Sequence, residues 1–380
     1  MNFQNKVHGC LAGAAVGDAL GGATERFSAE EIVDRYQGFV EGIVPPYHID
    51  FAEARPIAPF HKGDGHITDD SLMTEALVGV YSRVRRHLDA HSFAKHIIPE
   101  LVEFPRYIPE MEKDSLLIHR LYFAEKWLYQ RLYLGGVDPR EAGVGNMVNC
   151  GAAMYISPVG IVNAGDPAGA YYEAIDITGA HQSSYGREAA AVLSACVASA
   201  FEAEANYETI CETALKLAKD GTREAIESVL NVASKLDTWR GNLNKLRDAI
   251  RPFDSMGENF REMSPDARRP SRVQAIEELP IALGMVYLTK GDFREAVLGG
   301  VNYGRDSDSI ASMAGAIIGA LQGITCIPDE WISNVETASK RKYSDLAATM
   351  GQVAIEIMQS DHHEYENLRR LRADLLASRI

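Results

Sequence analysis

The sequence predicts an all-α, single-domain globular fold, and three observations support this prediction. Apolar residues recur throughout the chain at the i, i+3, i+4 and i+7 spacing of a helix face that packs into a core. Runs of alternating β-branched and aromatic residues between turns, which indicate β-strands, are nearly absent. No repeat or low-complexity linker divides the 380 residues, so we expect one domain over residues 1–380.

The apolar spacing also places individual helices along the chain. It predicts helices over residues 187–203, 222–237, 276–289 and 309–322. Gly315 and Gly319 lie on one face of the last of these helices, and their small size favours close packing against another helix. The final twenty residues place Leu368, Leu371 and Leu375 on one face of an amphipathic helix. We expect this helix to dock on its own domain; the alternative is a neighbouring subunit, which would make the protein an oligomer.

Three segments depart from the helical pattern. Residues 38–66 are rich in Pro and Gly, residues 251–273 are rich in charge, and both are long enough to be functional loops that line a site. Packing into a helix core is the favoured interpretation of the aromatic-rich segment 104–133, and a wall that stacks on a planar base or sugar is the alternative. Its seven rings are Phe104, Tyr107, Tyr122, Phe123, Trp127, Tyr129 and Tyr133.

Composition excludes several classes of protein. The 38 Lys and Arg against 53 Asp and Glu give a net charge of −15, and such a surface repels nucleic acids. Five cysteines occur without a C-x-x-C pair, which favours a reducing cytoplasm over a disulfide framework. Asp18 interrupts the apolar stretch near the N-terminus, and the apolar run at 310–321 is too short to span a bilayer. We therefore expect a cytoplasmic protein without nucleic-acid or membrane partners.

Three acidic clusters lie among small and apolar residues rather than among other charges. They are GDALGGATE at residues 17–25, TDDS at 68–71 and GRDSDS at 304–309. The second and third clusters precede helical patterns, so Asp70 or Ser71 and Asp308 or Ser309 are suited to cap those helices. A cap needs one such residue, however, and adjacent carboxylates repel each other unless a cation neutralises them. The excess of acidic groups therefore indicates a metal site.

The donor atoms of these clusters narrow the choice of metal. Carboxylate and hydroxyl oxygens are offered without any paired His or Cys, which favours Mg²⁺, Mn²⁺ or Ca²⁺. Four aspartates carry enough charge for two divalent ions that share a bridging carboxylate. The spacing does not match an EF-hand loop, which argues against a Ca²⁺ sensor.

The three clusters, in this order, resemble the ADP-ribosylglycohydrolase family over essentially the whole chain. The resemblance is carried by GCLAGAAVGDALGGATE at 9–25, ITDDSLM at 67–73, NCGAAMYISPVG at 149–160, and the segments EELPIAL and NYGRDSDSIASMAGAIIGALQG within 277–323. It implies an all-α fold around two Mg²⁺ or Mn²⁺ ions, and hydrolysis of a glycosidic bond at ribose C1 of an ADP-ribosyl compound or ADP-ribosylated target.

The resemblance also implies roles for particular residues. Glu25, Asp69 and Asp70 become the candidates for the acid or base, with no basis for choosing among them. Gly151, Met154, Tyr155 and His181 become candidates for substrate binding, with packing between helices as the alternative for the small residues and a capping role for His181. The implied metal ligands are Thr68, Asp69, Asp70, Asp306, Asp308 and Ser309.

Two positions depart from the family pattern. Tyr155 stands where the family often has arginine, and Arg305 stands where glycine often precedes the first aspartate of the third cluster. These changes keep open a second hypothesis, in which the substrate is a smaller N-riboside or nucleoside-like metabolite. A third hypothesis is a catalytically silent member that binds a ligand or has a structural role, although the intact ligand set argues against it.

Overall fold

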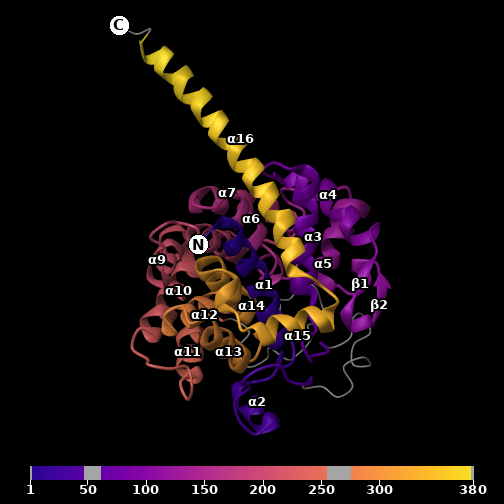
Figure 1. The fold of residues 1–380 in the computed structure, drawn as a ribbon, viewed down its shortest axis with the longest axis vertical. Helices are drawn as coiled ribbons and strands as arrows, with labels where there is room; N and C mark the ends of the chain where they lie inside the picture. The colour runs from indigo at the N-terminus through magenta and orange to yellow at the C-terminus, as the bar shows by residue number, and fades with distance from the viewer. Residues whose placement is uncertain (1, 47–60, 255–274, 378–380) are drawn as a thin grey trace.

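The computed structural model describes residues 2–46, 61–254 and 275–377, and these form a helical body from which one long helix projects (Figure 1). The α-helices are α1 (Phe3–Gly21), α2 (Ala29–Tyr36), α3 (Asp69–Val84), α4 (Ala90–Val102), α5 (Phe123–Leu128), α6 (Ser157–Val162), α7 (Pro167–Thr178), α8 (Ser184–Ser199), α9 (Tyr207–Leu217), α10 (Asp220–Ala233), α11 (Leu243–Ile250), α12 (Ala275–Leu288), α13 (Phe293–Tyr303), α14 (Ser307–Gln322), α15 (Asp329–Ser339) and α16 (Tyr343–Ala377). A π-helical turn, η3 (Tyr129–Leu134), and short 3₁₀ turns complete the helical elements.

The all-α prediction is confirmed. The described residues include only two short strands, β1 (Arg106–Ile108) and β2 (Lys113–Ser115), which pair antiparallel at the edge of the body. The four helices expected from the apolar spacing correspond to α8, α10, α12 and α14, with ends displaced by at most four residues. Within the described ranges, no helix combines the length and the apolar character that crossing a bilayer requires.

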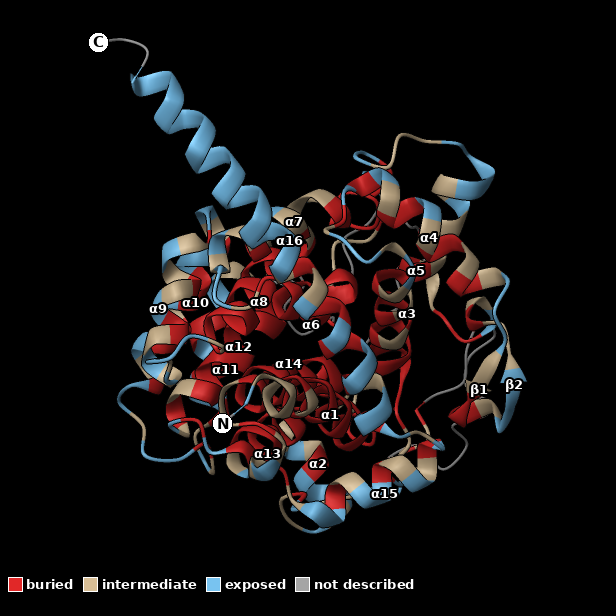
Figure 2. Cartoon of the chain, turned by 45° about the horizontal axis from the view of Figure 1, so that its top comes forward, coloured by how far each residue is buried: buried red, intermediate tan, exposed pale blue. Residues whose placement is uncertain are grey.

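Helices α1 and α14 pack against each other in the middle of the body, and both are buried along most of their length (Figure 2). Their backbones approach so closely that a Cβ added at Gly13 would lie 2.3 Å from the carbonyl oxygen of Gly315. A Cβ at Gly17 would lie 2.2 Å from the carbonyl oxygen of Ala311, one turn further along. Glycine is therefore required at this interface, which we call the glycine seam, and the expected close packing of Gly315 and Gly319 is confirmed.

The start of two helices differs from the expectation. Helix α3 has Thr68 as its N-cap, and helix α14 has Asp306 as its N-cap, two to three residues earlier than predicted. Thr68 accepts a hydrogen bond from the backbone N–H of Asp70 at 3.4 Å, so the first turn forms before the expected cap. The remaining acidic and hydroxyl residues of both clusters thus lie within the first helical turns rather than before them.

The aromatic-rich segment is not a helix core, so that prediction is wrong. It is divided among β1, β2, α5 and short turns, and none of its seven rings is fully buried. Phe104 and Tyr133 are exposed, while Phe123 and Trp127 pack at a centroid distance of 6.0 Å. The expected loop at 251–273 lies mostly outside the described residues, since only 251–254 are described there.

The C-terminal helix does not dock on the body over its whole length, contrary to the favoured expectation. Helix α16 contacts α1, α3 and α6 through its first half, with Tyr343, Met350 and Ile357 among the buried side chains. All residues from 359 to 377 are exposed, and this part projects into solvent (Figures 1 and 2). The amphipathic pattern predicted the helix correctly but not what covers its apolar face.

Candidate metal centre

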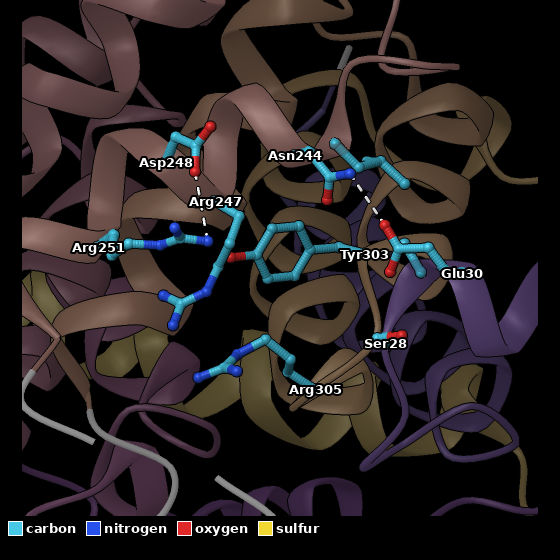
Figure 3. A pocket seen from close by; sticks show the side chains of 10 residues that line it. Ser28, Glu30, Asn244, Arg247, Asp248, Arg251, Tyr303 and Arg305 are labelled. Carbon is cyan, nitrogen blue, oxygen red and sulfur yellow. Dashed lines mark hydrogen bonds and ion pairs between the residues drawn. The ribbon is translucent and has the colours of Figure 1, made fainter. Parts of the chain in front are cut away.

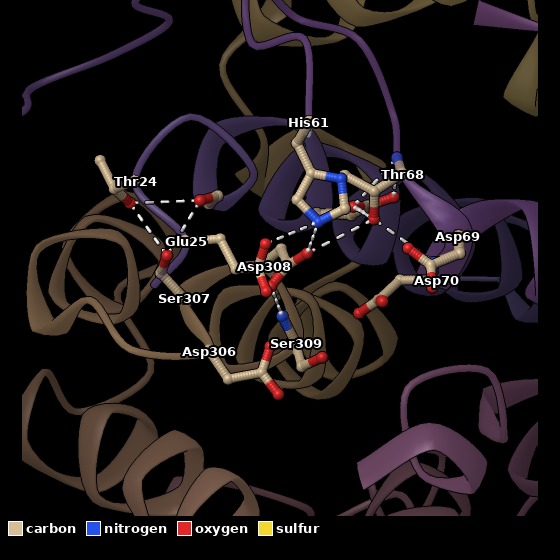
Figure 4. A network of polar contacts seen from close by, with 12 residues as sticks. Thr24, Glu25, His61, Thr68, Asp69, Asp70, Asp306, Ser307, Asp308 and Ser309 are labelled. Carbon is tan, nitrogen blue, oxygen red and sulfur yellow. Dashed lines mark hydrogen bonds and ion pairs between the residues drawn. The ribbon is translucent and has the colours of Figure 1, made fainter. Parts of the chain in front are cut away.

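The three acidic clusters meet in space, although the first and third are almost 300 residues apart in sequence. The C-terminal end of α1 lies beside the N-terminal ends of α3 and α14, because α14 runs antiparallel to α1 along the glycine seam (Figure 4). Carboxylate oxygens of Asp18, Asp70 and Asp308, one from each cluster, lie within 4.8 Å of one another. The buried group formed by these clusters is called the carboxylate cluster below.

Asp18 fixes the start of α3. Its carboxylate accepts hydrogen bonds from the backbone N–H of Thr68 at 3.0 Å and of Ser71 at 3.1 Å, and from both hydroxyl groups. Four donors on one buried carboxylate hold the T-D-D-S turn in a single orientation. Asp18 is therefore a positioning residue, and it directs Asp69 and Asp70 into the cluster.

The start of α14 is held in a similar way. Thr24 donates a hydrogen bond to the carbonyl oxygen of Val301 at 2.8 Å, and Ser307 donates to the carbonyl oxygen of Gly21 at 2.9 Å. These bonds tie the end of α1 to the turn that carries Asp306 and Asp308. Asp306 accepts from the Cys150 thiol at 2.9 Å, and Asp308 accepts from the backbone N–H of Ser309 at 3.0 Å.

Two buried basic side chains lie against the cluster. His61 Nε2 is 3.0 Å from Asp308 Oδ2 and 3.1 Å from Glu25 Oε2, and its Nδ1 is 3.0 Å from Glu110 Oε1. Arg120 is fully buried, 3.1 Å from Asp69 Oδ1, and also paired with Glu110. These two side chains partly neutralise carboxylates that would otherwise repel one another.

Glu25 is the most accessible carboxylate in this group. Its side chain retains 15% of its exposure, compared with 4% for Asp308, and it lies at the rim where α1 gives way to the following turn. The His61 contact holds one of its oxygens beside the cluster. Glu25 is thus placed where a carboxylate can reach both a ligand and solvent water.

Burial and mutual repulsion disfavour ionisation of the aspartates. Burial and the neighbouring Asp308 raise the pKa of Asp18 to about 7. Burial, again with Asp308, raises the pKa of Asp70 and of Asp306 well above the usual range. Burial opposes the charged form of His61, but Tyr122, Glu25 and Asp308 outweigh it and raise the pKa of His61. The chain alone therefore leaves the cluster short of positive charge.

The cluster has the donor atoms that a hard divalent cation requires. Asp70 Oδ2 is buried and has no hydrogen-bond partner among the described residues, which is costly unless a ligand or ion meets it. Thr68, Ser309 and the surrounding aspartates add further oxygens, so the residues fit Mg²⁺ or Mn²⁺. Cys150, Glu278 and Asp306 form an adjoining group, and both carboxylate oxygens of the buried Glu278 also lack a partner in the described part of the chain.

The four candidates for substrate binding are all buried. Tyr155 and His181 stack with ring centroids 5.8 Å apart, and the Tyr155 hydroxyl lies 3.0 Å from His181 Nδ1. His181 Nε2 lies 3.0 Å from the carbonyl oxygen of Ala124, so both ring nitrogens are engaged within the chain. Burial lowers the pKa of His181 to about 4, and the ring is neutral at pH 7. Met154 is also buried.

Gly151 allows a buried carboxyl group to approach the turn before α6. A Cβ added at Gly151 would lie 2.7 Å from Glu125 Oε1, so a larger residue would displace Glu125. Burial and the neighbouring Asp69 raise the pKa of Glu125 to about 8. Gly151 therefore leaves room for the Glu125 side chain. His181 also lies close to Gly151, and Tyr155 stacks on His181.

Arg305 points away from the carboxylate cluster. Its φ of 59° lies in the left-handed region that glycine adopts most easily, which explains why glycine suits this position. Its side chain hydrogen-bonds to Glu277 at 2.9 Å and lines a separate pocket of about 410 Å³ with Arg247 and Tyr303 (Figure 3). The change from glycine to arginine therefore alters this neighbouring pocket.

Sequence reasoning missed several residues of the site. His61, Glu110, Arg120, Glu125 and Glu278 stand in no recognisable spacing relative to the acidic motifs, and only the tertiary fold brings them together. Asp64 and His66 are close to the T-D-D motif in sequence but do not join these residues. Asp64 is exposed, and His66 Nδ1 lies 2.8 Å from the carbonyl oxygen of Gly63, so these two residues shape the loop.

Comparison with known proteins identifies the same family as the motifs. The chain matches the family model described as ADP-ribosylglycohydrolase over residues 1–363. It is 26% identical to an uncharacterized protein of Archaeoglobus fulgidus, over 88% of this chain and 92% of that protein. It is 24% identical to the ADP-ribosylarginine hydrolase Tri1 of Pseudomonas putida, over 87% of this chain and 74% of that protein.

Two further comparisons extend this result. The chain is 23% identical to the Homo sapiens ADP-ribosylhydrolase ARH3, over 87% of this chain and 89% of that protein. A solved structure described as an ADP-ribosylglycohydrolase-related protein complex superposes with a TM-score of 0.58 at 19% identity. That superposition covers 93% of this chain and 99% of the other, which shows a shared fold.

Proposed function

This chain belongs to the ADP-ribosylglycohydrolase family, and we propose that it is a metal-dependent hydrolase acting at ribose C1 of an ADP-ribosyl compound or an ADP-ribosylated target. The names of its relatives support hydrolysis of ADP-ribose linkages as the class of reaction. The observation that carries the metal dependence is the carboxylate cluster, in which a buried oxygen of Asp70 has no partner among the described residues.

Two divalent cations, Mg²⁺ or Mn²⁺, would be held by Thr68, Asp69, Asp70, Asp306, Asp308 and Ser309, and would supply fixed positive charge that orients the oxygen groups of the ligand. Asp18 keeps the T-D-D-S turn in place through its four hydrogen bonds. The hydrogen bonds from Thr24 and Ser307 hold the turn that carries Asp306 and Asp308. The chain thereby fixes the ligand set before substrate binds.

Glu25 is our candidate for the group that accepts a proton from the attacking water. It is the most exposed carboxylate beside the cluster, and His61 holds one of its oxygens. Cleavage at C1 passes through a transition state that resembles an oxocarbenium ion, so ionised carboxylates near C1 stabilise it. Asp69 lies deeper and is paired with Arg120, and Asp70 is buried among other aspartates, which favours ligand roles for both.

A substrate panel tests this proposal. The protein, with Mg²⁺ or Mn²⁺, is incubated with mono-ADP-ribosylated arginine and serine peptides and with O-acetyl-ADP-ribose, and released ADP-ribose is measured. We expect turnover of at least one of them and its loss with EDTA. Glu25→Gln should lower kcat by about 100-fold or more while bound metal is unchanged. The matched control is Glu202→Gln, an exposed carboxylate remote from the cluster.

A smaller riboside remains a second candidate because of one observation. The ring of Tyr122 is half-buried near the cluster, with its centroid 6.1 Å from that of His61 and 4.9 Å from the Arg120 guanidinium, so an aromatic side chain borders the site. Free N-ribosides belong in the same panel, and turnover well above that of the ADP-ribosyl substrates would favour this candidate. Failure to turn over any substrate, in protein that binds metal, would support a catalytically silent member instead.

A further inference from the structure

Helix α16 consists of two halves with opposite surroundings. The first half buries Tyr343, Ala347, Met350, Ala354 and Ile357 against the body at the spacing of one helix face. The second half, residues 359–377, is exposed at every position and is called the arm below. At 1.5 Å per residue the arm extends about 28 Å beyond the body.

The arm carries apolar side chains that the body does not cover. Tyr365, Leu368, Leu371 and Leu375 are 63%, 44%, 58% and 61% exposed. Their spacing places them along one side of the helix, and this side continues the face that the first half of α16 buries against the body. A solvated helix of this length is marginal in water unless an apolar face is packed against something. The arm therefore has the chemistry of an interaction surface.

Charge on the same side of the arm changes sign along its length. Asp361 and Glu364 lie on the apolar side near the body, and Arg372 lies on that side near the tip. Asp361 is held by His87 Nε2 at 3.0 Å, which leaves Glu364 and Arg372 as the principal charges that could face another chain. A partner for this surface must be apolar in the middle, basic opposite Glu364 and acidic opposite Arg372.

We propose that the arm pairs antiparallel with the arm of a second copy of this chain. Leu368 is the middle one of the exposed apolar residues Tyr365, Leu368 and Leu371, so an antiparallel pair centred on it places the two Leu368 residues at the same level. Glu364 of each arm then lies level with Arg372 of the other arm, since both residues are four positions from that centre. The arm is thus complementary to itself in charge and in apolar character.

A parallel pair does not satisfy the same surface. It would place Glu364 level with Glu364 and Arg372 level with Arg372, and like charges at one level repel. The body lies at one end of the arm (Figure 1). A parallel pair would therefore bring two whole bodies together, whereas antiparallel arms would separate them by the length of the overlap. The family match ends at residue 363, so the pairing surface lies beyond the segment shared with the family.

Sedimentation velocity of the full chain tests the pairing. We expect a dimer at about 10 μM protein, and a monomer after truncation following Ser360. Leu368→Glu should weaken dimerisation by about 100-fold because it places two like charges at the centre of the pair. Val144→Glu is the control, because Val144 is an exposed apolar residue on the body, and it should leave the dimer unchanged.

Charge exchange tests the orientation. Glu364→Arg alone and Arg372→Glu alone should each weaken the dimer by about tenfold, since each replaces two attractions by two repulsions. The double variant Glu364→Arg/Arg372→Glu should restore the affinity of the natural chain, because the two charges are only exchanged. A natural chain that stays monomeric at these concentrations would overturn the proposal, as would a double variant no tighter than the single ones. Neither result bears on hydrolysis, so the two proposals can fail separately.

Discussion

Helices α1 and α14 form the glycine seam and, together with α3, the carboxylate cluster, but the chain satisfies the packing of the seam more completely than the polar groups of the cluster. Along the seam, the backbones of α1 and α14 touch at Gly13, Gly17 and Gly315 with no room for another atom. At the end of the seam, α1, α3 and α14 contribute buried aspartates, and Asp70 of α3 retains an oxygen without a partner among the described residues. The seam is optimised for stability, and the cluster is not.

This difference indicates what the seam is for. A rigid contact between α1 and α14 fixes Asp18 and Asp308 relative to each other, so the repelling carboxylates cannot move apart. Strain and unpaired polar atoms persist at a site only where the surrounding structure enforces them. Variants in the seam should therefore cost stability, whereas variants in the cluster should cost activity and spare stability.

The largest expected effect is in the seam. Gly315→Val places a Cβ at 2.2 Å from the carbonyl oxygen of Gly13, so the helices must separate. We expect a loss of at least about 3 kcal/mol in the free energy of unfolding, or no folded protein. Urea unfolding followed by circular dichroism measures it. The control is Gly42→Ala, whose Cβ would meet only Trp331 Nε1 at 3.6 Å and should change stability little.

The next effect is in the cluster and has the opposite sign on stability. Asp70→Asn removes one of several repelling buried carboxylates, so the metal-free protein should become more stable by about 1 kcal/mol. The same change should lower ADP-ribose release by at least about 100-fold, because it removes a charged oxygen from the ligand set. Urea unfolding in EDTA and a release assay measure the two quantities. An unstable, active variant would contradict this account of the cluster.

An intermediate effect is expected for the residue that links the two regions. Asp18→Asn lies at the end of the seam and leaves donors of Thr68 and Ser71 facing an amide. We expect metal affinity to fall by about 10- to 100-fold, as for other groups that orient metal ligands. Isothermal titration calorimetry with Mn²⁺ measures the affinity. Unchanged affinity would show that the T-D-D-S turn keeps its orientation without Asp18.

The most gradual effect is a pH dependence of the stability of the metal-free protein. Burial raises the pKa of Glu125 from 4.5 to about 8, so the folded protein keeps this proton after the unfolded chain has lost it. Stability should therefore fall as pH rises from about 5 to about 8, by on the order of 1 kcal/mol per pH unit, and level off above that range. Asp18, with its pKa raised to about 7, adds to this slope in the same direction.

A variant isolates the contribution of Glu125. Glu125→Gln keeps the shape of the side chain but cannot ionise, so the decline in stability between pH 5 and pH 8 should become shallower. Thermal unfolding in EDTA across this range measures it, with Glu202→Gln as the control that should keep the full slope. If stability declined equally with pH in both variants, a group other than Glu125 would be responsible for the decline.

Much of the fold and several aspartates of the carboxylate cluster were predictable from local sequence. Helices α8, α10, α12 and α14 follow from the spacing of apolar residues, because burial of one helix face leaves a period that survives in a single sequence. The aspartates of α3 and α14 were recognisable because acidic residues rarely stand together among small, apolar ones. Both signals are carried by neighbours in sequence.

The rest of the site depends on residues brought together by the fold. His61 and Arg120 meet Asp308 and Asp69 from segments with no spacing in common, so no sequence pattern links them. The apolar face of the arm was visible as a period, but a period shows only that something covers the face. The period does not tell whether the body or a second molecule covers the face. In the structure, Ile357 is the last residue of α16 that is buried against the body.

Counting bound ions is the sharpest test of the proposal that the carboxylate cluster holds two divalent cations. The protein is stripped with EDTA, loaded with Mn²⁺ and dialysed, and bound manganese per chain is measured by inductively coupled plasma mass spectrometry. The account predicts two ions per natural chain and per Glu202→Gln chain, and one or none after Asp306→Ala. No bound manganese in the natural chain, or two ions retained by Asp306→Ala, would contradict it.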